Sequence, residues 1–393
     1  MTYFKLNPEC YLISGKAKAA IYDLITGNVF GLNEKEKEVL VMCENGVPVE
    51  NIRGGKNILE EVCDKLLGEF YPNRIFVEKL RLGSPIHDYQ PGNPIELERV
   101  FLEINNSCDY DCWFCGYHGI RRTLGCFGCN KWKENGEPMS VDRVKRLVKE
   151  IKKLGCKILY ITGGDLTLDW DRTLEIAECA ENLLDKVYIM LNEKKISTVI
   201  EDLNELKVHP VIQTEIDSMQ KAFGLNSFTI LLVTTPDEFE KARSASQRLL
   251  KEVDRNITIK VDFVSKDFGL LKSHKTRIPL LKIPRVNTQV FWHNKKWHPC
   301  LGKSLAITYD GRVLPCPMMR NYSFGNIKDK ELYKIFEGKK EIEKFWNLTL
   351  DNIEKCKGCE FRYACSDCRA LEENLTGKLK GKRLCNYEPE EGK

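Results

Sequence analysis

The chain has 393 residues, of which 42% are hydrophobic and 30% are charged, and its formal net charge is +4. A chain of this length is expected to form two or three domains, each with its own hydrophobic core. The sequence contains no run of about 18 apolar residues, so no membrane span is expected. The near balance of 61 basic and 57 acidic side chains argues against a general affinity for nucleic acid.

Seventeen cysteines are a high number for an ordinary chain of this length. The chain starts without the charged and apolar pattern of a secretory signal, so we expect a cytoplasmic protein with reduced thiols. Reduced thiols that cluster in sequence usually bind metals in that compartment. Five scattered cysteines are instead expected to be small core residues. These five are Cys10, Cys43, Cys63, Cys156 and Cys179.

Residues 1–84 are predicted to form a small winged-helix-like module without clustered cysteines. Residues 19–32 have the pattern of two short strands joined by a turn. Residues 34–46 read as a helix that ends at a glycine, and residues 58–70 as a second helix. Glycine and proline then mark residues 85–96 as a linker between domains.

Residues 97–292 alternate between strand and helix patterns. This alternation predicts an α/β fold with a parallel sheet, and six units indicate a partial (β/α)6 barrel. The chemistry of parallel barrels lies at the carboxyl ends of the strands. Residues 293–393 form a less periodic, cysteine-rich C-terminal domain. The six predicted strands cover residues 100–104, 157–162, 186–191, 209–217, 228–234 and 257–264.

The first cysteine cluster follows the first barrel strand directly, with Cys108, Cys112 and Cys115 spaced as C-x3-C-x2-C. A structural zinc site takes four protein ligands, so zinc would also need His118 or a distant cysteine. A 4Fe–4S cluster is usually held by four thiolates, so three thiolates leave one iron open to a substrate or cofactor. The spacing allows both sites, and its position in the fold favours the iron–sulfur cluster.

This triplet after the first strand of a partial barrel resembles the radical S-adenosylmethionine (radical SAM) superfamily. The resemblance continues after the second strand, where Gly163, Gly164 and Asp165 are similar to the family's Gly-Gly-Glu motif. Two departures are that Asp replaces Glu and that Leu166 replaces the usual Pro.

The resemblance implies that the three cysteines hold a SAM-binding 4Fe–4S cluster. It further implies that the Gly-Gly-Asp motif contacts the amino group of SAM. A polar residue after the third strand and two at the end of the fourth strand are further candidates for contacts with SAM. These candidates are Asn192, Glu215 and Asp217.

The C-terminal cysteines and the phrase LAITYDGRVLPC resemble the SPASM extension of radical SAM enzymes, which holds two auxiliary iron–sulfur clusters. The last pair is C-x2-C where the family usually has C-x3-C. The fourth ligand of the first cluster stays open between a substrate thiolate and a histidine, His293 or His298. The resemblance assigns Cys300, Cys316 and Cys368 to the first auxiliary cluster, and Cys356, Cys359, Cys365 and Cys385 to the second.

An additional pair, Cys126 and Cys129, lies in an insertion after the first cluster, among arginines and lysines. Basic neighbours are expected to lower the pKa of these thiols and make them reactive. Three roles stay open: incidental loop thiols, a catalytic or redox role in substrate handling, and ligation of another metal.

Residues 7–70 resemble the recognition element of peptide-modifying enzymes, which binds a leader peptide as an added strand. A generic winged helix, even one that binds DNA, is the alternative for this module. Together the resemblances imply a radical SAM/SPASM peptide maturase. Such an enzyme reductively cleaves SAM, abstracts hydrogen from a ribosomally made precursor peptide, and forms a thioether or carbon–carbon crosslink.

The resemblance implies SAM and three 4Fe–4S clusters as cofactors. It implies a precursor peptide with a leader and a flavodoxin- or ferredoxin-type electron donor as partners. The alternative enzyme is a sulfatase-maturase-like oxidase that forms formylglycine. The alternative from another class is a zinc-binding winged-helix regulatory protein.

Overall fold

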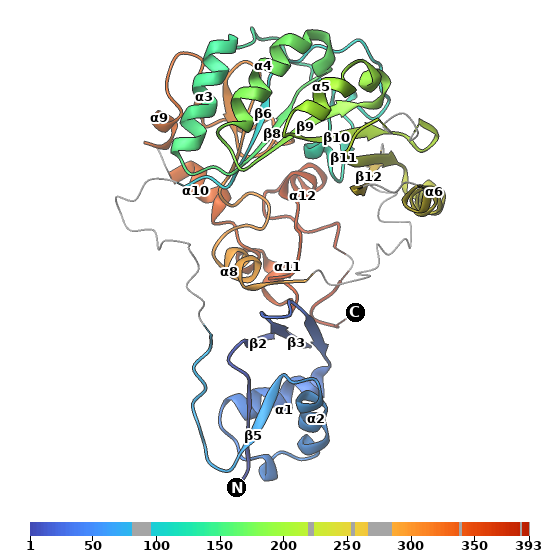
Figure 1. The fold of residues 1–393 in the computed structure, drawn as a ribbon. Helices are drawn as coiled ribbons and strands as arrows, with labels where there is room; N and C mark the ends of the chain where they lie inside the picture. The colour runs from blue at the N-terminus through green and yellow to red at the C-terminus, as the bar shows by residue number, and fades with distance from the viewer. Residues whose placement is uncertain are drawn as a thin grey trace. The chain divides into compact units, whose positions relative to one another are not determined.

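The computed structural model divides the chain into two compact units, each described by itself (Figure 1). The predicted C-terminal domain, residues 293–393, is shared between the units, and residues 85–95 of the predicted linker lie outside the described residues. Unit 1 comprises Met1–Asn93, Arg277–Gly302 and Trp346–Lys393, and unit 2 comprises Pro94–Thr276 and Lys303–Phe345. The structure describes residues 1–80, 96–218, 224–252, 256–265, 285–337, 340–385 and 387–392.

A ten-stranded sheet forms the centre of unit 2, in the order β15-β14-β13-β6-β8-β9-β10-β11-β12-β7. All neighbours from β13 to β12 are parallel, so the predicted α/β fold with a mostly parallel sheet is confirmed. The strands are β6 (Arg99–Glu103), β7 (Arg121–Arg122), β8 (Ile158–Thr162), β9 (Lys186–Asn192), β10 (His209–Thr214), β11 (Ser227–Thr234), β12 (Asn256–Ser265), β13 (Ser304–Ile307), β14 (Arg312–Leu314) and β15 (Gly325–Asn326).

Two strands of this sheet differ from the sequence-based expectation. β13 lies beyond the six predicted barrel strands in sequence, yet it pairs in parallel with β6 and extends the sheet. β10 ends at Thr214, three residues before the predicted end, because its ladders with β9 and β11 stop there. Gln213 and Thr214 are therefore the last residues at the carboxyl end of β10.

Helices of unit 2 cover one face of the sheet, and the inserted segment that contains Cys126 covers the other. Figure 1 shows α3, α4 and α5 on the same side of the sheet. The other face presents alternate residues such as Phe101 and Tyr160, and Leu124, Cys126 and Phe127 pack against it. The helices are α3 (Val141–Lys153), α4 (Trp170–Glu181), α5 (Ile200–Glu205), α6 (Phe239–Glu252) and α9 (Tyr333–Phe336), with α10 (Lys340–Trp346) at the boundary with unit 1.

The N-terminal part of unit 1 contains two small antiparallel sheets and two helices. The predicted hairpin is present as β3 and β4, and the first predicted helix is α1. The second predicted helix, residues 58–70, is wrong at its end, because Leu66 has a φ of 59° and the next residues pair with β1. The elements are β1 (Tyr3–Leu6), β2 (Cys10–Ser14), β3 (Ala19–Asp23), β4 (Val29–Leu32), α1 (Glu34–Glu44), α2 (Gly55–Asp64) and β5 (Gly68–Tyr71).

The same unit holds the C-terminal helices α8 (Thr288–Lys296), α11 (Glu354–Lys357) and α12 (Arg369–Thr376). Tyr22 of β3 packs in one core with Phe291 and Tyr363. Its hydroxyl donates a hydrogen bond of 2.9 Å to the carbonyl of Glu360. The N-terminal strands therefore share a hydrophobic core with the cysteine-rich end of the chain. Among the described residues, no helix has the length and apolarity needed to cross a membrane.

Two buried core thiols predict a loss of stability at alkaline pH. Burial raises the pKa of Cys10 and of Cys43 from 9.0 to about 12. Since the pKa in the folded state exceeds that of the unfolded chain, the stabilisation is complete below pH 9 and is lost as the pH rises towards 12. We expect the melting temperature of the Cys10→Ala/Cys43→Ala variant to fall less steeply above pH 9 than that of the wild type. A variant at partly exposed Cys179 should keep the wild-type slope; equal slopes for all three proteins would contradict the prediction.

Candidate functional site: a thiol-lined pocket at the end of the sheet

The three cysteines of the first cluster line one pocket in unit 2, beyond the end of β6. The amide of Cys115 donates to the carbonyl of Cys112 (2.9 Å), which closes the turn that carries both thiols. Burial raises the pKa of Cys108 and of Cys112, the latter to about 11. The pocket is lined by Cys108, Tyr110, Cys112, Phe114, Cys115, Cys129, Asn130, Lys131, Gly164, Asp165, Asn192 and Gln213.

The Gly-Gly-Asp motif follows β8 and packs directly on the loop that leads to the first cysteine. A Cβ atom on Gly163 would lie 2.6 Å from the carbonyl oxygen of Asn105, and one on Gly164 would lie 2.1 Å from that of Ser107. The amide of Asp165 donates to the same Ser107 carbonyl (2.7 Å). The two glycines therefore allow the motif to approach the cysteine loop, and they bring Asp165 beside the thiols.

Asp165 lines the pocket and is 4% exposed, and one of its carboxylate oxygens makes no hydrogen bond. Its Oδ1 accepts from the amide (3.0 Å) and the hydroxyl (2.7 Å) of Thr167. Its Oδ2 accepts no hydrogen bond, and the ammonium of Lys195 lies 3.5 Å away. A carboxylate oxygen held in this way is suited to accept hydrogen bonds from the amino group of a ligand.

The strand-end candidates divide into one that reaches the pocket and two that do not. Asn192 lines it, and its Nδ2 lies 3.9 Å from the sulfur of Cys112. Glu215 is not among the lining residues and accepts from the indole of Trp113 (3.0 Å). Asp217 is exposed and pairs with Lys241 (3.3 Å). Because β10 ends at Thr214, the residue of this segment that lines the pocket lies within the strand, before Glu215 and Asp217.

Gln213 is that residue, and it is 1% exposed. It lies opposite Asn192 in the ladder between β9 and β10. The sequence feature that could have indicated this residue is the single amide side chain, Gln213, that follows the apolar residues in PVIQT.

The two thiols of the additional pair, Cys126 and Cys129, lie in different environments. Cys129 lines the pocket, whereas Cys126 packs with Phe127 against the aromatic face of the sheet. The expected lowering of the thiol pKa by basic neighbours is wrong for Cys129, because burial raises it more than the Arg122 guanidinium lowers it. The positive charge of Arg122 is partly compensated by the Asp262 carboxylate, 3.3 Å from its Nε.

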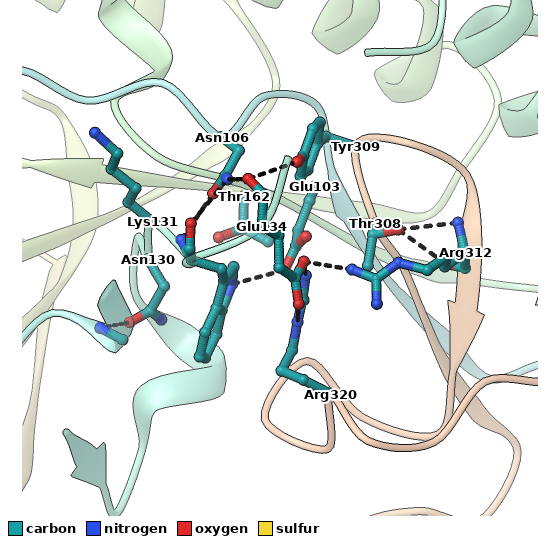
Figure 2. A network of polar contacts seen from close by, with 12 residues as sticks. Glu103, Asn106, Asn130, Lys131, Glu134, Thr162, Thr308, Tyr309, Arg312 and Arg320 are labelled. Carbon is teal, nitrogen blue, oxygen red and sulfur yellow. Dashed lines mark hydrogen bonds and ion pairs between the residues drawn. The ribbon is translucent and has the colours of Figure 1, made fainter. Parts of the chain in front are cut away.

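A buried ionic network fixes the segment that follows Cys129 (Figure 2). Arg320 donates to Glu103 at the end of β6 (2.6 Å) and to Glu134 (2.9 Å), and its guanidinium lies over the ring of Trp132. The indole of Trp132 donates to Glu103 as well (3.1 Å), and Arg312 pairs with Glu134 from the other side. Burial raises the pKa of Glu103. The network ties residues 132–134 to β6 and to the segment after β14.

The donor set fits a polynuclear cluster better than zinc. A tetrahedral zinc ion with Zn–S bonds of about 2.3 Å requires its ligands within about 4 Å of one another. In the described part of the chain, no three Cys, His, Asp or Glu side chains are arranged to hold a single metal ion. His118, the candidate fourth zinc ligand, pairs with Asp111 (2.7 Å) and is not a lining residue. The three thiols of the cysteine loop around one pocket instead match a larger 4Fe–4S cluster.

Comparison with protein families gives two matches along the chain. Residues 102–261 match the radical SAM superfamily, and residues 299–360 match the SPASM iron–sulfur cluster-binding domain. The chain is a radical SAM enzyme. It therefore uses SAM and iron–sulfur clusters, and the zinc-binding regulatory protein is excluded. A comparison with curated proteins gave no match.

Solved structures similar to this radical SAM enzyme are distant in sequence. Streptococcus suis SuiB bound to S-adenosylmethionine is 12% identical over 98% of this chain and 100% of SuiB, with a TM-score of 0.49. SuiB bound to the precursor peptide SuiA is 14% identical over 98% and 100%, with a TM-score of 0.48. The enzyme anSMEcpe with bound AdoMet is 15% identical over 75% of this chain and 93% of its own, with a TM-score of 0.49.

The four cysteines assigned to the second auxiliary cluster of this radical SAM enzyme lie near one another in unit 1. Burial raises the pKa of Cys356 and Cys359 to about 12, and repulsion from Cys365 and Cys385 adds to the increase. The nearby ammonium of Lys382 acts in the opposite direction on Cys356. The proximity of these four thiols supports their assignment to one auxiliary cluster, which was made from their spacing in the sequence.

The cysteines assigned to the first auxiliary cluster belong to both units. Cys368 lies near Cys300 in unit 1, since the Cys300 thiol contributes to the raised pKa of Cys368. Cys316 belongs to unit 2. The unusual C-x2-C spacing left it open whether Cys368 belongs to the first auxiliary cluster. Its proximity to Cys300 supports that assignment, and the complete ligand set stays a prediction.

His298 does not supply the fourth ligand of that cluster. The side chain is 0% exposed, and its Nδ1 accepts from the amides of Cys300 (3.1 Å) and Leu301 (2.9 Å). Its Nε2 therefore carries the proton and donates to Asp367 (3.0 Å). Since both ring nitrogens are engaged, His298 positions the Cys300 loop, and His293 is the histidine left as a candidate ligand.

Proposed function

We propose that this radical SAM enzyme modifies a ribosomally made precursor peptide and joins two of its residues by a thioether or carbon–carbon bond. The radical SAM pocket and the grouped thiols of the SPASM region support the chemistry. The observation that carries the choice of substrate is an open strand edge in the N-terminal module. A peptide is the substrate class that such an edge accepts.

The open edge is the outer side of β4, where no other strand of the described residues pairs, since the three-stranded sheet has the order β2-β3-β4. The amide of Asp23 donates to Asn28 (2.9 Å), the pair that follows Tyr22 and Val29 in the β3–β4 register. Hydrogen-bonded and non-hydrogen-bonded pairs alternate in antiparallel ladders. Val29 and Gly31 therefore direct their backbone groups away from β3, where an added peptide strand can bind them.

The chain's own residues would prepare SAM for reaction. Cys108, Cys112 and Cys115 would hold the SAM-binding cluster, and Asp165 Oδ2 would accept a hydrogen bond from the amino group of SAM. When bound, the cluster supplies the electron that cleaves SAM, and cleaved SAM removes hydrogen from the peptide. The buried side chains of Phe114, Asn192 and Gln213 in the pocket wall would limit the access of water to this reaction.

We further propose three 4Fe–4S clusters, one at this pocket and two held by the SPASM cysteines. The auxiliary clusters would accept an electron from the product or bind a substrate thiolate. A flavodoxin- or ferredoxin-type protein would supply electrons in the cytoplasm, where thiols stay reduced.

Co-expression with a precursor peptide encoded by a neighbouring gene tests the reaction. We expect mass spectrometry to find a loss of two hydrogens per link and no fragment ions between the linked residues. Formylglycine, the product of a sulfatase-maturase-like oxidase, would instead leave backbone fragmentation complete and react with a hydrazide probe. That result would replace the proposed function with the alternative.

Proline at Gly31 tests the strand edge. We expect Gly31→Pro to weaken binding of the leader peptide about five-fold, because it removes an outward-facing backbone donor worth about 1 kcal/mol. The matched control is Gly31→Ala, which keeps the donor and places its Cβ 3.4 Å from the Phe361 ring, an ordinary contact. Fluorescence anisotropy with a labelled leader measures both. Equal affinities for the two variants would show that the peptide binds elsewhere.

A further inference from the structure

Cys129 is a fourth thiol in the pocket of the predicted SAM cluster. Its neighbours in sequence place it between the cluster loop and the Gly-Gly-Asp motif. The carbonyl of Gly128 accepts from the hydroxyl of Thr162 (3.1 Å), and the amide of Asn130 donates to the carbonyl of Gly163 (2.7 Å). The next amide, that of Lys131, lies 3.4 Å from the sulfur of Cys115.

Side chains from two barrel strands hold the thiol in place. Gln213 of β10 donates through Nε2 to the sulfur of Cys129 (3.2 Å). Its Oε1 accepts from Arg122 (2.6 Å), which in turn pairs with Asp262 of β12. Gln213, Arg122 and Asp262 are at most 2% exposed, so the arrangement is part of the core. Buried side chains therefore fix the position of the Cys129 thiol, which is not expected of an incidental loop thiol.

The same pocket carries an independent mark of a ligand site. The buried carboxylate of Asp165 lines it, and its Oδ2 accepts no hydrogen bond and has the ammonium of Lys195 3.5 Å away. Four thiols around one 4Fe–4S cluster give every iron a protein ligand, whereas three leave one iron open. Cys108, Cys112, Cys115 and Cys129 all line this pocket.

We propose that Cys129 binds the fourth iron of the cluster before SAM arrives, and that SAM displaces it. In the exchange the Fe–S bond to Cys129 breaks and a bond from iron to the SAM amino nitrogen forms. The proton that the SAM ammonium loses passes to the released sulfur of Cys129. No electron is transferred in this step. Cys129 therefore protects the open iron until the cofactor is in place.

Cys126 does not share this role, although it belongs to the same C-x2-C pair. It packs in the cluster that contains Phe101 and Tyr160, on the face of the sheet, and is not a lining residue. This difference supplies a matched control within one short segment. The proposal depends on the cluster at the first three cysteines and is independent of the identity of the peptide.

Affinity for SAM is the first test, measured by anaerobic equilibrium dialysis on the reconstituted, oxidised holoenzyme. A competing internal ligand reduces the apparent affinity by the fraction of protein that is free to bind. We expect Cys129→Ala to bind SAM about ten-fold more tightly than the wild type, and Cys126→Ala to bind it as the wild type does. An unchanged or weaker affinity in Cys129→Ala would overturn the proposal.

Electron paramagnetic resonance of the reduced holoenzyme is the second test, and it does not depend on turnover. Without SAM, the SAM-cluster signal of Cys129→Ala should differ from that of the wild type, and Cys129→Ser should give a third signal. With saturating SAM, all three spectra should coincide. If the spectra without SAM are identical while peptide modification is lost, Cys129 acts on the substrate and does not bind iron, which refutes the proposal.

Discussion

Cys112→Ala is expected to abolish SAM cleavage, with at least a 1,000-fold loss of 5′-deoxyadenosine formation, on the order of 4 kcal/mol in barrier height. The thiol lines the pocket with Cys108 and Cys115, so its loss leaves two thiolates in the cysteine loop, and a cluster that used Cys129 as its third ligand would not keep that iron open to SAM. The cofactor carries out the difficult chemistry, so loss of its anchor removes the reaction rather than slowing it. Anaerobic chromatography of the product with dithionite as reductant measures the effect.

Two control variants separate this effect from general damage to the fold. Cys156→Ala removes a buried thiol outside the pocket and should leave SAM cleavage unchanged. Cys359→Ala removes a proposed auxiliary ligand in unit 1 and should lose about four irons per chain while SAM cleavage persists. Deoxyadenosine formation by Cys112→Ala at the wild-type rate would contradict the assignment of the SAM-binding cluster.

The parts of the site that could be predicted from the sequence depend on local spacing. The cysteine loop and the Gly-Gly-Asp motif each follow a buried, apolar strand, and parallel strands bring their carboxyl ends to one edge. Asp165 therefore lies near the cysteines as expected. Glu215 and Asp217 do not line the pocket, because the position of the pocket residues depends on where β10 leaves its ladders, and the flanking strands decide that point.

Long-range pairings decided the remaining features. The hairpin of β13 and β14 is visible in its Asp-Gly turn, but no local pattern indicates that β13 pairs with β6, some 200 residues away. The two thiols of the C-x2-C pair are equivalent in the sequence. Only packing separates Cys129, which Gln213 holds in the pocket, from Cys126 on the face of the sheet. The basic residues around them suggested reactive thiols, whereas burial dominates the pKa of Cys129.

Arg320→Met is expected to destabilise unit 2 by about 3–5 kcal/mol, because it leaves the buried Glu103 carboxylate without its charged partner. The guanidinium is the shared donor to Glu103 and Glu134, and its side chain is 10% exposed. Arg312 also pairs with Glu134, but its side chain is 27% exposed, so Arg312→Met should cost much less. Urea unfolding followed by the fluorescence of Trp132, with the other tryptophans replaced by phenylalanine, compares the two variants.

A second substitution shows whether the loss arises from unpaired charge. Adding Glu103→Gln to Arg320→Met removes the more deeply buried carboxylate, and we expect part of the stability to return. Because the network anchors residues 132–134 just after the Cys129 position, Arg320→Met should also change the affinity for SAM. If Arg320→Met and Arg312→Met lose equal stability, the segment is held by its apolar packing against the sheet, and the ionic network does not determine where Cys129 lies.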